Sequence, residues 1–207
     1  MTLKYTINKY RRYSYWNKHQ AIFIHVPKAA GTSINHAIYG RTLGHYTANE
    51  LKATFPRLFE RSFVFSFVRN PWDRAASAYR FAKQGRTESM GIANSEHYRV
   101  PEFETFEKFV LEWLPAQDLV NSDFVFQLQS RFIFDKNGVN LCDFIGKVET
   151  MQSDIEIVKQ RLGRDFTVKE MNTTKTSTSY RGLYSLEMAD VIAKLYASDI
   201  SAFEYEF

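Results

Sequence analysis

One stretch, from Ala21 to Tyr39 (AIFIHVPKAAGTSINHAIY), most constrains how this chain can fold. It begins with a short apolar run that a proline ends, a pattern typical of a buried β-strand. Small residues then form a loop over Pro27–Ser33, and apolar residues recur after it at helical spacing, with Thr32 or Ser33 expected to cap the helix. A helix N-terminus behind such a loop attracts anions. The stretch therefore predicts a phosphate-binding loop, and a plain strand–loop–helix connection is the alternative.

The residues that we expect to bind the anion lie together in this loop. Lys28 supplies a positive charge, and the small residues let a ligand approach the backbone. These small residues are Ala30, Gly31, Thr32 and Ser33. In the nucleoside-triphosphate version of the motif, GxxxxGK[ST], the lysine directly precedes the hydroxyl residue that holds Mg²⁺. The early position of Lys28 counts against that version, so a kinase using ATP and Mg²⁺ is kept only as the alternative function.

The positive charge of the chain is concentrated near this loop. No Asp or Glu occurs before Glu50, and residues 1–49 carry seven Lys and Arg; because the whole chain has a net charge of +4, the remainder sums to 4 − 7 = −3. Such a field favours an anionic ligand. Residues 1–20 interleave basic and aromatic side chains, which indicates either a peripheral arm that packs its rings on the protein, the interpretation we favour, or a nucleic-acid-binding segment.

Two further apolar runs predict the rest of a parallel sheet. Ser62–Val68 reads as a second buried strand, ended by Arg69-Asn70-Pro71 and followed by a helix over Trp72–Lys83. Asn140–Val148 suggests another strand. Strands that alternate with helices predict an α/β fold, and ligands then bind beyond the carboxyl ends of the strands. We therefore expect Lys28 and Arg69 on one rim of the sheet, within a single domain over residues 21–207.

Shorter patterns predict the remaining elements. Asn49–Arg61 reads as a helix interrupted by Pro56, and the aromatic residues of an amphipathic helix over Glu102–Leu114 are expected in the core. Residues 123–134 are ambiguous between helix and strand. Thr150 is expected to cap a helix that ends near Gly163, and Ser185 to cap the last helix.

A second motif begins at Arg69 and reads RNPWDRAASAY. Arg69 can grip a phosphate with its planar fork, and Ser77 can place a hydroxyl on the same phosphate. Arg74 shares a helical face with Ser77, or else forms an exposed ion pair with Asp73 or Glu104. The loop and this motif, R-N-P-x-x-R-x-x-S-x-Y, resemble the 5′-phosphosulfate and 3′-phosphate motifs of sulfotransferases. The loop sequence is closest to the carbohydrate, 2-O-type group (sulfotransferase family 2), and the similarity covers the chain from Ala21 onward.

The resemblance implies a P-loop-like parallel β-sheet flanked by helices on both faces and a reaction without a metal. The donor would be 3′-phosphoadenosine 5′-phosphosulfate (PAPS), the product adenosine 3′,5′-bisphosphate, and the acceptor a carbohydrate or glycolipid hydroxyl. Lys28 would stabilise the leaving group, and His45 lies where this group places a catalytic histidine; His97 and Glu50 are the second and third candidates for the base. Lys175, in a polar loop, is expected to reach the nucleotide.

Location and partners follow from composition and from the same resemblance. The single cysteine, Cys142, fits a reducing compartment. Neither a membrane span nor a secretory signal is recognisable. Golgi sulfotransferases carry a membrane anchor, and none is recognisable in this sequence. We therefore expect a soluble, cytoplasmic, bacterial enzyme that binds no nucleic acid and can form an oligomer.

Overall fold

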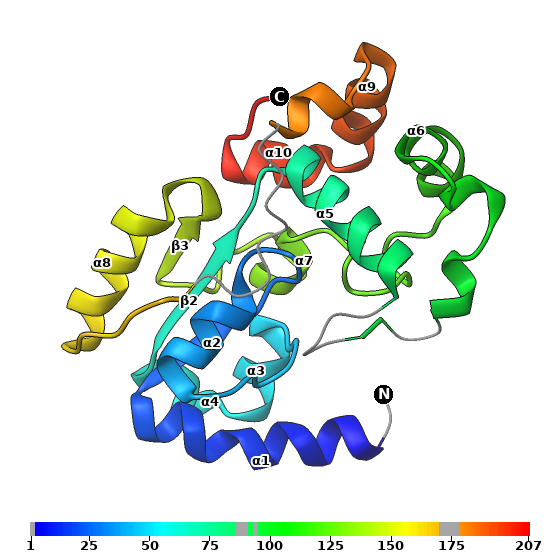
Figure 1. Ribbon diagram of the computed structural model, residues 1–207. Helices are drawn as coiled ribbons and strands as arrows, with labels where there is room; N and C mark the ends of the chain where they lie inside the picture. Colours follow the sequence, from blue (N-terminus) through cyan, green and yellow to red (C-terminus); the bar gives the residue numbers. More distant parts are fainter. Residues whose placement is uncertain (1–2, 86–90, 93–94, 170–178) are drawn as a thin grey trace. The chain divides into compact units, whose positions relative to one another are not determined.

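The computed structural model describes residues 3–85, 91–92, 95–169 and 179–207. The chain divides into two compact units (Figure 1). The first comprises Met1–Val68 and Arg131–Met171, and the second comprises Arg69–Ser130 and Asn172–Phe207. The division into an arm over residues 1–20 and a single domain over 21–207 stays a prediction.

The first unit contains a parallel sheet, three-stranded among the described residues, in the order β1-β2-β3. Its strands are β1 (Ala21–Ile24), β2 (Phe63–Val68) and β3 (Phe144–Lys147). Ala21 pairs with Phe63, and Phe65 with Phe144. Phe65 and Phe67 are completely buried, so their aromatic surface stabilises the central strand. The predicted α/β class with a parallel sheet is confirmed, whereas its P-loop-like form with helices on both faces stays a prediction.

Helices flank this sheet within the first unit. They are α1 (Leu3–His19), α2 (Gly31–Tyr39), α3 (Ala48–Thr54), α4 (Pro56–Arg61), the 3₁₀ turn η5 (Val148–Thr150) and α8 (Met151–Leu162). Pro56 is the first residue of α4, which confirms the predicted interruption. Thr150 stands at the N-cap of α8 but accepts no capping bond; its hydroxyl donates to Asp154 over 2.7 Å. The expected cap is therefore wrong, while Gly163 ends the helix in a left-handed conformation as predicted.

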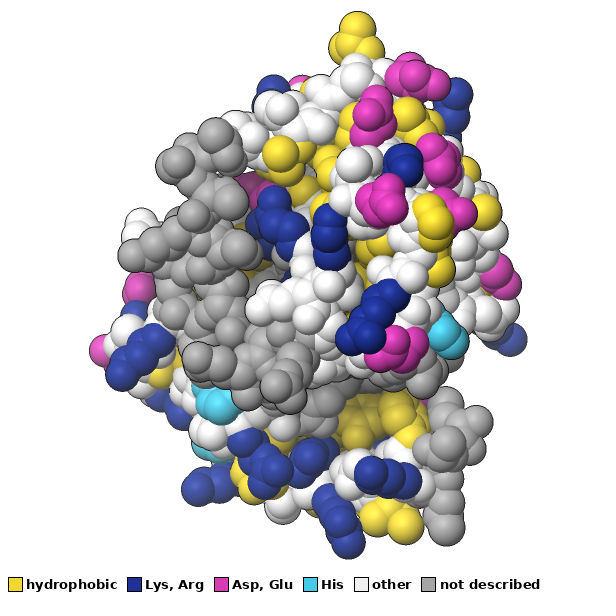
Figure 2. Space-filling model, turned by 45° about the vertical axis from the view of Figure 1, so that its right-hand side comes forward, with side chains coloured by type: hydrophobic (Ala, Val, Ile, Leu, Met, Phe, Trp, Pro, Cys, Tyr) yellow, Lys and Arg dark blue, Asp and Glu magenta, His cyan; other side chains and the backbone are white. Residues whose placement is uncertain are grey.

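Residues 3–19 form a helix, α1, that packs its aromatic rings on the first unit. Trp16 is 1% exposed and contacts Tyr46 and Phe55 edge-on or tilted. Tyr10 and Tyr13 both meet Phe55 at ring-centroid distances of 5.2 Å. This packing is what the peripheral-arm interpretation expects. Lys4, Arg11 and Lys18 of this helix are exposed, whereas Lys9 is buried. In Figure 2, Lys and Arg side chains gather at the lower end of the view, over α1 and its neighbours.

The second unit is helical over its described residues. Its elements are α5 (Pro71–Gln84), η1 (Ser95–Tyr98), η2 (Pro101–Phe103), α6 (Phe106–Lys108), the π-turn η3 (Phe109–Trp113), η4 (Leu114–Ala116), η6 (Tyr180–Leu183), α9 (Leu186–Leu195) and α10 (Ala197–Phe203). Residues 123–134 were ambiguous between helix and strand. A short helix, α7 (Ser130–Ile133), forms within this segment and begins where the chain passes from the second unit to the first. Ser185 accepts a hydrogen bond from the amide of Met188 over 3.2 Å, as predicted for the cap of α9.

The predicted helix over Glu102–Leu114 is broken into short turns of different pitch. Its aromatic residues nevertheless form the core, since Phe103 and Phe109 are 2% and 0% exposed. The rings of Phe103, Phe109 and Trp113 contact one another with centroid distances of 4.8 to 5.6 Å; Phe103 meets the other two edge-on, and Phe109 and Trp113 stack. Packing of large rings thus overrides the regular helical period that the sequence suggested.

Candidate functional site

The connection between β1 and α2 contains two residues in the left-handed conformation, Lys28 (φ 66°) and Ala30 (φ 56°). The amide of Val26 donates to the carbonyl of Ile24 over 3.1 Å, and the amide of Ala29 to Val26 over 3.4 Å. A left-handed conformation costs a residue with a Cβ roughly 1–2 kcal/mol. Strain of this kind gathers at ligand-binding sites. The tight turn, placed directly before a helix N-terminus, is the backbone form that an anion-binding loop requires.

Helix α2 begins at Gly31, one residue before the hydroxyl residues that we expected to cap it. Its N-cap is Ala30, which makes no side-chain capping bond. Thr32 and Ser33 lie inside the first turn and are 9% and 6% exposed. The expected cap is wrong because left-handed Ala30 turns the chain straight into the helix. The first turn of a helix carries outward-pointing amides and the positive end of its dipole, so this turn presents donors at the loop.

Gly31 is required by the ring of His25. A Cβ built on Gly31 would lie 1.9 Å from Cδ2 and 2.2 Å from Nε2 of that ring. His25 is itself 3% exposed and packs between the strand and the loop. Burial holds the pKa of His25 well below its ordinary value of 6.5, and the neighbouring His45 and Lys28 lower this pKa further. His25 is thus a neutral ring that supports the underside of the loop.

Asn35, which is 1% exposed, links three segments of the site. Its Nδ2 donates to the carbonyl of Gly31 over 2.8 Å and to Nδ1 of His25 over 3.2 Å. Its Oδ1 accepts from the amide of Leu43 over 3.4 Å. Because Nδ1 of His25 accepts this bond, the proton of His25 resides on Nε2. Asn35 therefore ties the loop, the strand end and the segment that carries His45 into one arrangement.

His45 lies against His25, with ring centroids 4.0 Å apart. Its Nδ1 is 3.0 Å from the carbonyl oxygen of His25. Since a carbonyl can only accept, Nδ1 of His45 carries the proton, and the lone pair of the neutral ring is on Nε2. Burial lowers the pKa of His45, although the bond to the carbonyl opposes that effect. The ring is therefore neutral at pH 7, as a general base must be.

The other two candidates for a base lie elsewhere or have structural roles. The Glu50 carboxylate accepts from the amide of Thr47 over 2.9 Å, as half of the capping box that starts α3. It also accepts from the Tyr5 hydroxyl over 3.1 Å. His97 belongs to the second unit and is exposed in the turn η1. His45 is the candidate whose ring contacts His25 at the end of β1.

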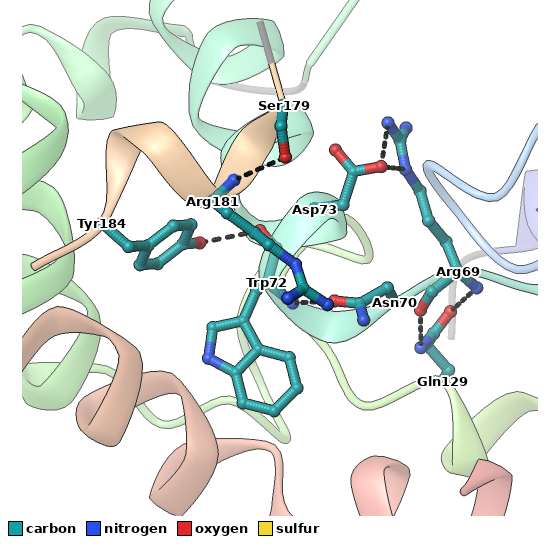
Figure 3. A network of polar contacts seen from close by, with 8 residues as sticks. All are labelled: Arg69, Asn70, Trp72, Asp73, Gln129, Ser179, Arg181 and Tyr184. Atoms are coloured by element: carbon teal, nitrogen blue, oxygen red, sulfur yellow. Dashed lines mark hydrogen bonds and ion pairs between the residues drawn. The ribbon is translucent and has the colours of Figure 1, made fainter. Parts of the chain in front are cut away.

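In the second unit, the Arg-Asn-Pro sequence starts helix α5. Asn70 is the N-cap: its Oδ1 accepts from the amide of Trp72 over 3.1 Å, while its Nδ2 donates to the carbonyl of Glu206 over 2.9 Å. Pro71 occupies the first helical position, where a missing amide proton costs nothing. Tyr184 donates to the carbonyl of Trp72 over 2.7 Å (Figure 3). These bonds fix the direction in which the chain enters the helix, directly after Arg69.

The backbone of Arg69 is held on both sides by one glutamine. The amide of Arg69 donates to Oε1 of Gln129 over 2.9 Å, and Nε2 of Gln129 donates back to the carbonyl of Arg69 over 2.8 Å (Figure 3). Asp199, which is completely buried, accepts from the amides of Gln129 and Ser130 over 2.7 and 2.9 Å. The guanidinium of Arg69 pairs with the carboxylate of Asp73 at 2.7 Å. These contacts hold both the backbone and the side chain of Arg69 at the start of α5.

The exposed ion pair that we considered for Arg74 is wrong. Arg74 is 2% exposed, and its Nη2 donates to the carbonyl of Phe124 over 3.5 Å. Burial lowers its pKa, an effect that Tyr196 and Asp199 oppose. Asp73 pairs with Arg69 instead. Arg74 is therefore an interior residue of the second unit. The sequence pattern could not predict this, because helical spacing does not reveal which side of a helix other residues cover.

Ser77 lies one turn beyond Asp73 on α5 and is half-buried. Arg80 follows it at the helical spacing of three residues and was not among the predicted ligands. Its guanidinium lies close enough to Arg69 and Asp73 for both charges to act on its pKa. Lys175, the remaining predicted ligand, lies outside the described residues.

The predicted site residues thus fall into two groups. The first unit brings together Lys28, Ala30, Gly31, Thr32, Ser33 and His45, and the second brings Ser77 onto the helix that Arg69 precedes. The expectation that Lys28 and Arg69 share one rim stays a prediction. Three supporting residues were missed, namely Asn35, Gln129 and Asp199. Only Asn35 had a local signal, since it stands four residues after Gly31 on the same helix.

Two negative findings concern the described residues alone. Within residues 3–85, 91–92, 95–169 and 179–207, no group of three or more His, Cys, Asp and Glu is arranged to hold a metal ion. In the same ranges, every helix is too short or too polar to cross a bilayer.

Comparison with known proteins places the chain in a family. A family profile with the description "Sulfotransferase family" matches residues 11–206, nearly the whole chain. Comparison with curated proteins and with solved structures gives no match.

Proposed function

The chain belongs to the sulfotransferase family, and from this membership we propose that it transfers a sulfuryl group from PAPS to a hydroxyl of a carbohydrate or glycolipid. Sulfuryl transfer by an enzyme is the activity of the family. What we propose beyond this activity is the identity of the donor and the class of the acceptor. The carbohydrate acceptor is supported by the sequence of the loop, His25-Val26-Pro27-Lys28 followed by Gly31-Thr32-Ser33, which resembles that of carbohydrate sulfotransferases.

The observation that carries the proposal is the link between the loop and His45. The strained loop, the first turn of α2 and Lys28 form the kind of donor set that an anionic group requires. His25 and Asn35 connect that donor set to His45 by hydrogen bonds of 2.8 to 3.4 Å and by the ring contact. An anion site and a neutral imidazole in one arrangement are what in-line displacement by a hydroxyl needs.

The roles of the residues follow from this arrangement. The donor, when bound, supplies a sulfuryl group whose leaving oxygen gains negative charge as the bond to sulfur breaks. Lys28 and the amides of residues 30–33 would stabilise that oxygen, and losing one such donor typically costs about 100- to 1000-fold in rate. Nε2 of His45 would take the proton of the acceptor hydroxyl, which typically contributes about 100- to 10000-fold. Arg69 and Ser77 would hold the 3′-phosphate, and Lys175 would reach the nucleotide.

A cytoplasmic location is also part of the proposal. Its support is the single cysteine, Cys142, since proteins of oxidising compartments commonly use disulfides.

Thermal unfolding in the presence of two nucleotides tests the donor class. Adenosine 3′,5′-bisphosphate should raise the melting temperature, because a ligand at about 100 times its Kd adds about 2.7 kcal/mol of stability. ATP with Mg²⁺ is the comparison ligand and should give a smaller shift. Stabilisation by ATP with Mg²⁺ and none by the bisphosphate would refute the proposal and favour a phosphotransferase.

Transfer itself is measured with radiolabelled PAPS and a panel of polysaccharides and glycolipids. Label should appear in a sugar acceptor, and an aryl alcohol serves as the comparison acceptor. Labelling of the aryl alcohol alone would overturn the carbohydrate assignment while leaving the donor class intact.

A further inference from the structure

One face of helix α5 carries a row of polar side chains. Asp73, Ser77 and Arg80 are separated by four and then three residues, so they follow one another on the same side of the helix. Arg69 reaches this row through its ion pair with Asp73, which Figure 3 shows at the start of α5. The row therefore begins and ends with an arginine.

The first of these arginines is already neutralised. Two bonds join Arg69 to Asp73, Nε to Oδ2 over 2.8 Å and Nη2 to Oδ2 over 2.7 Å. The charges of the two side chains sum to zero. A phosphate monoester carries a charge of about −1.5 to −2 at pH 7, so the pair alone is a weak partner for it. A second cation is needed on this face.

Arg80 carries an unused hydrogen-bond donor. Its Nε is buried and has no hydrogen-bond partner among the residues that the structure describes. Buried donors are almost always paired, and an unpaired one in a native protein is expected to have a function or a missing partner. Arg12, Trp16 and Ser62 carry such atoms in the first unit, so Arg80 is the single case within the described part of the second unit.

The electrostatic surroundings of Arg80 agree with this view. Burial lowers its pKa and the positive charge of Arg69 lowers it further, while Asp73 and Tyr184 oppose the effect. Two guanidinium groups thus repel each other across the row, with one carboxylate between them. An anion bound at Ser77 would give Nε of Arg80 an acceptor and relieve the repulsion at once.

We propose that Arg80 binds the 3′-phosphate together with Arg69 and Ser77, and that Arg80 makes the protein select a 3′-phosphorylated nucleotide over its 5′-monophosphate. The inference rests on the proposed donor class. Arg69 fixes the position of the phosphate through its bonds to Asp73 and Gln129, and Arg80 supplies the unbalanced charge. Selection follows because adenosine 5′-monophosphate has no group that Arg80 can bind, whereas the bisphosphate offers its 3′-phosphate.

Calorimetric titration with the two nucleotides tests the inference. Wild-type protein should bind adenosine 3′,5′-bisphosphate more tightly than adenosine 5′-monophosphate. In Arg80→Gln the affinity for the bisphosphate should fall about 10- to 100-fold, the range for losing a hydrogen bond between charged groups. The affinity for the monophosphate should stay within about 2-fold, so the preference collapses. Arg99→Gln is the matched control: Arg99 is exposed, pairs with Glu96 at 2.9 Å, and should leave both affinities unchanged.

Each other outcome has a definite meaning. Unchanged bisphosphate affinity in Arg80→Gln, or an equal loss for both nucleotides, overturns the role of Arg80 while leaving the proposed function standing. Wild-type protein that binds both nucleotides equally overturns the donor class and the inference with it. If Arg80→Gln does not fold, Arg80→Lys replaces it; this variant keeps the charge but loses the planar fork, and a partial loss for the bisphosphate alone supports the inference.

Discussion

Replacing Gly31 by alanine tests whether His25 and the loop are packed as described. The φ of Gly31 is not in the left-handed range, so alanine is compatible with the backbone, and helix propensity alone would favour it by up to about 1 kcal/mol. The new Cβ would nevertheless lie 1.9 Å from the ring of His25. Accommodating an extra carbon in a packed site costs about 1–3 kcal/mol. Turning the ring away also loses its bond to Asn35, about 1 kcal/mol.

The balance is a net destabilisation of about 1–3 kcal/mol, measured by urea unfolding monitored by circular dichroism at pH 7.5. In the double variant Gly31→Ala with His25→Ala the clash is absent, so the two changes should couple favourably by about 1–2 kcal/mol. Gly182→Ala is the control, since nothing lies within 4 Å of a Cβ at that position and stability should hardly change. A Gly31→Ala protein as stable as wild type, or a coupling energy near zero, would refute the packing of His25 beneath the loop.

Three further predictions concern the role of His45, the pH dependence set by the histidine pair, and the carboxylate of Asp199. His45→Ala should abolish sulfuryl transfer and leave the affinity for adenosine 3′,5′-bisphosphate within about 2-fold, because the ring is placed for proton transfer; unchanged turnover would remove His45 from the mechanism. The pKa values of His25 and His45 are below 6.5 in the folded protein, so the unfolded chain binds more protons below that pH. The free energy of unfolding should therefore be constant above about pH 7.5 and fall below about pH 6.5, by up to about 1.4 kcal/mol per pH unit for each histidine. Equal urea midpoints at about pH 7.5 and 5.5 would contradict this. Asp199→Asn leaves the amide of Gln129 or of Ser130 without an acceptor in a buried position, so urea unfolding should show a loss of about 1–3 kcal/mol, and an unshifted midpoint would contradict the role of Asp199.

The strands and several helix boundaries could be predicted because their signals are local. Phe63–Val68 is a run of apolar and β-branched residues closed by Arg69-Asn70-Pro71, and the structure ends β2 at Val68. Pro56 lacks an amide proton, and the Ser185 side chain accepts a hydrogen bond from a backbone amide. Each of these helix starts could therefore be predicted to the exact residue. Family membership was predictable for the same reason, since the two motifs are short and contiguous.

The errors concern features that tertiary packing decides. Ala30 has no sequence signal for a left-handed conformation, so the start of α2 was misjudged. The alternative that gave Arg74 an exposed ion pair with Asp73 or Glu104 was wrong, since Arg74 is buried beside the carbonyl of Phe124. Gln129 binds the backbone of Arg69, which lies far away along the chain, so no periodic pattern marks it; Asn35 had only its spacing of four residues from Gly31 as a signal. Arg80 did carry a signal, its helical spacing from Ser77.

The order of the sheet has a consequence for how the protein is made. β2 is the central strand, but its partner β3 begins only at Phe144, after the chain has left the sheet at Val68. On a ribosome, one edge of β2 therefore emerges long before the strand that will cover it. Contacts so distant in sequence form slowly, and an uncovered apolar strand edge can pair with another chain. Newly synthesised copies should accordingly be most prone to aggregate during the interval before Lys147 leaves the ribosome.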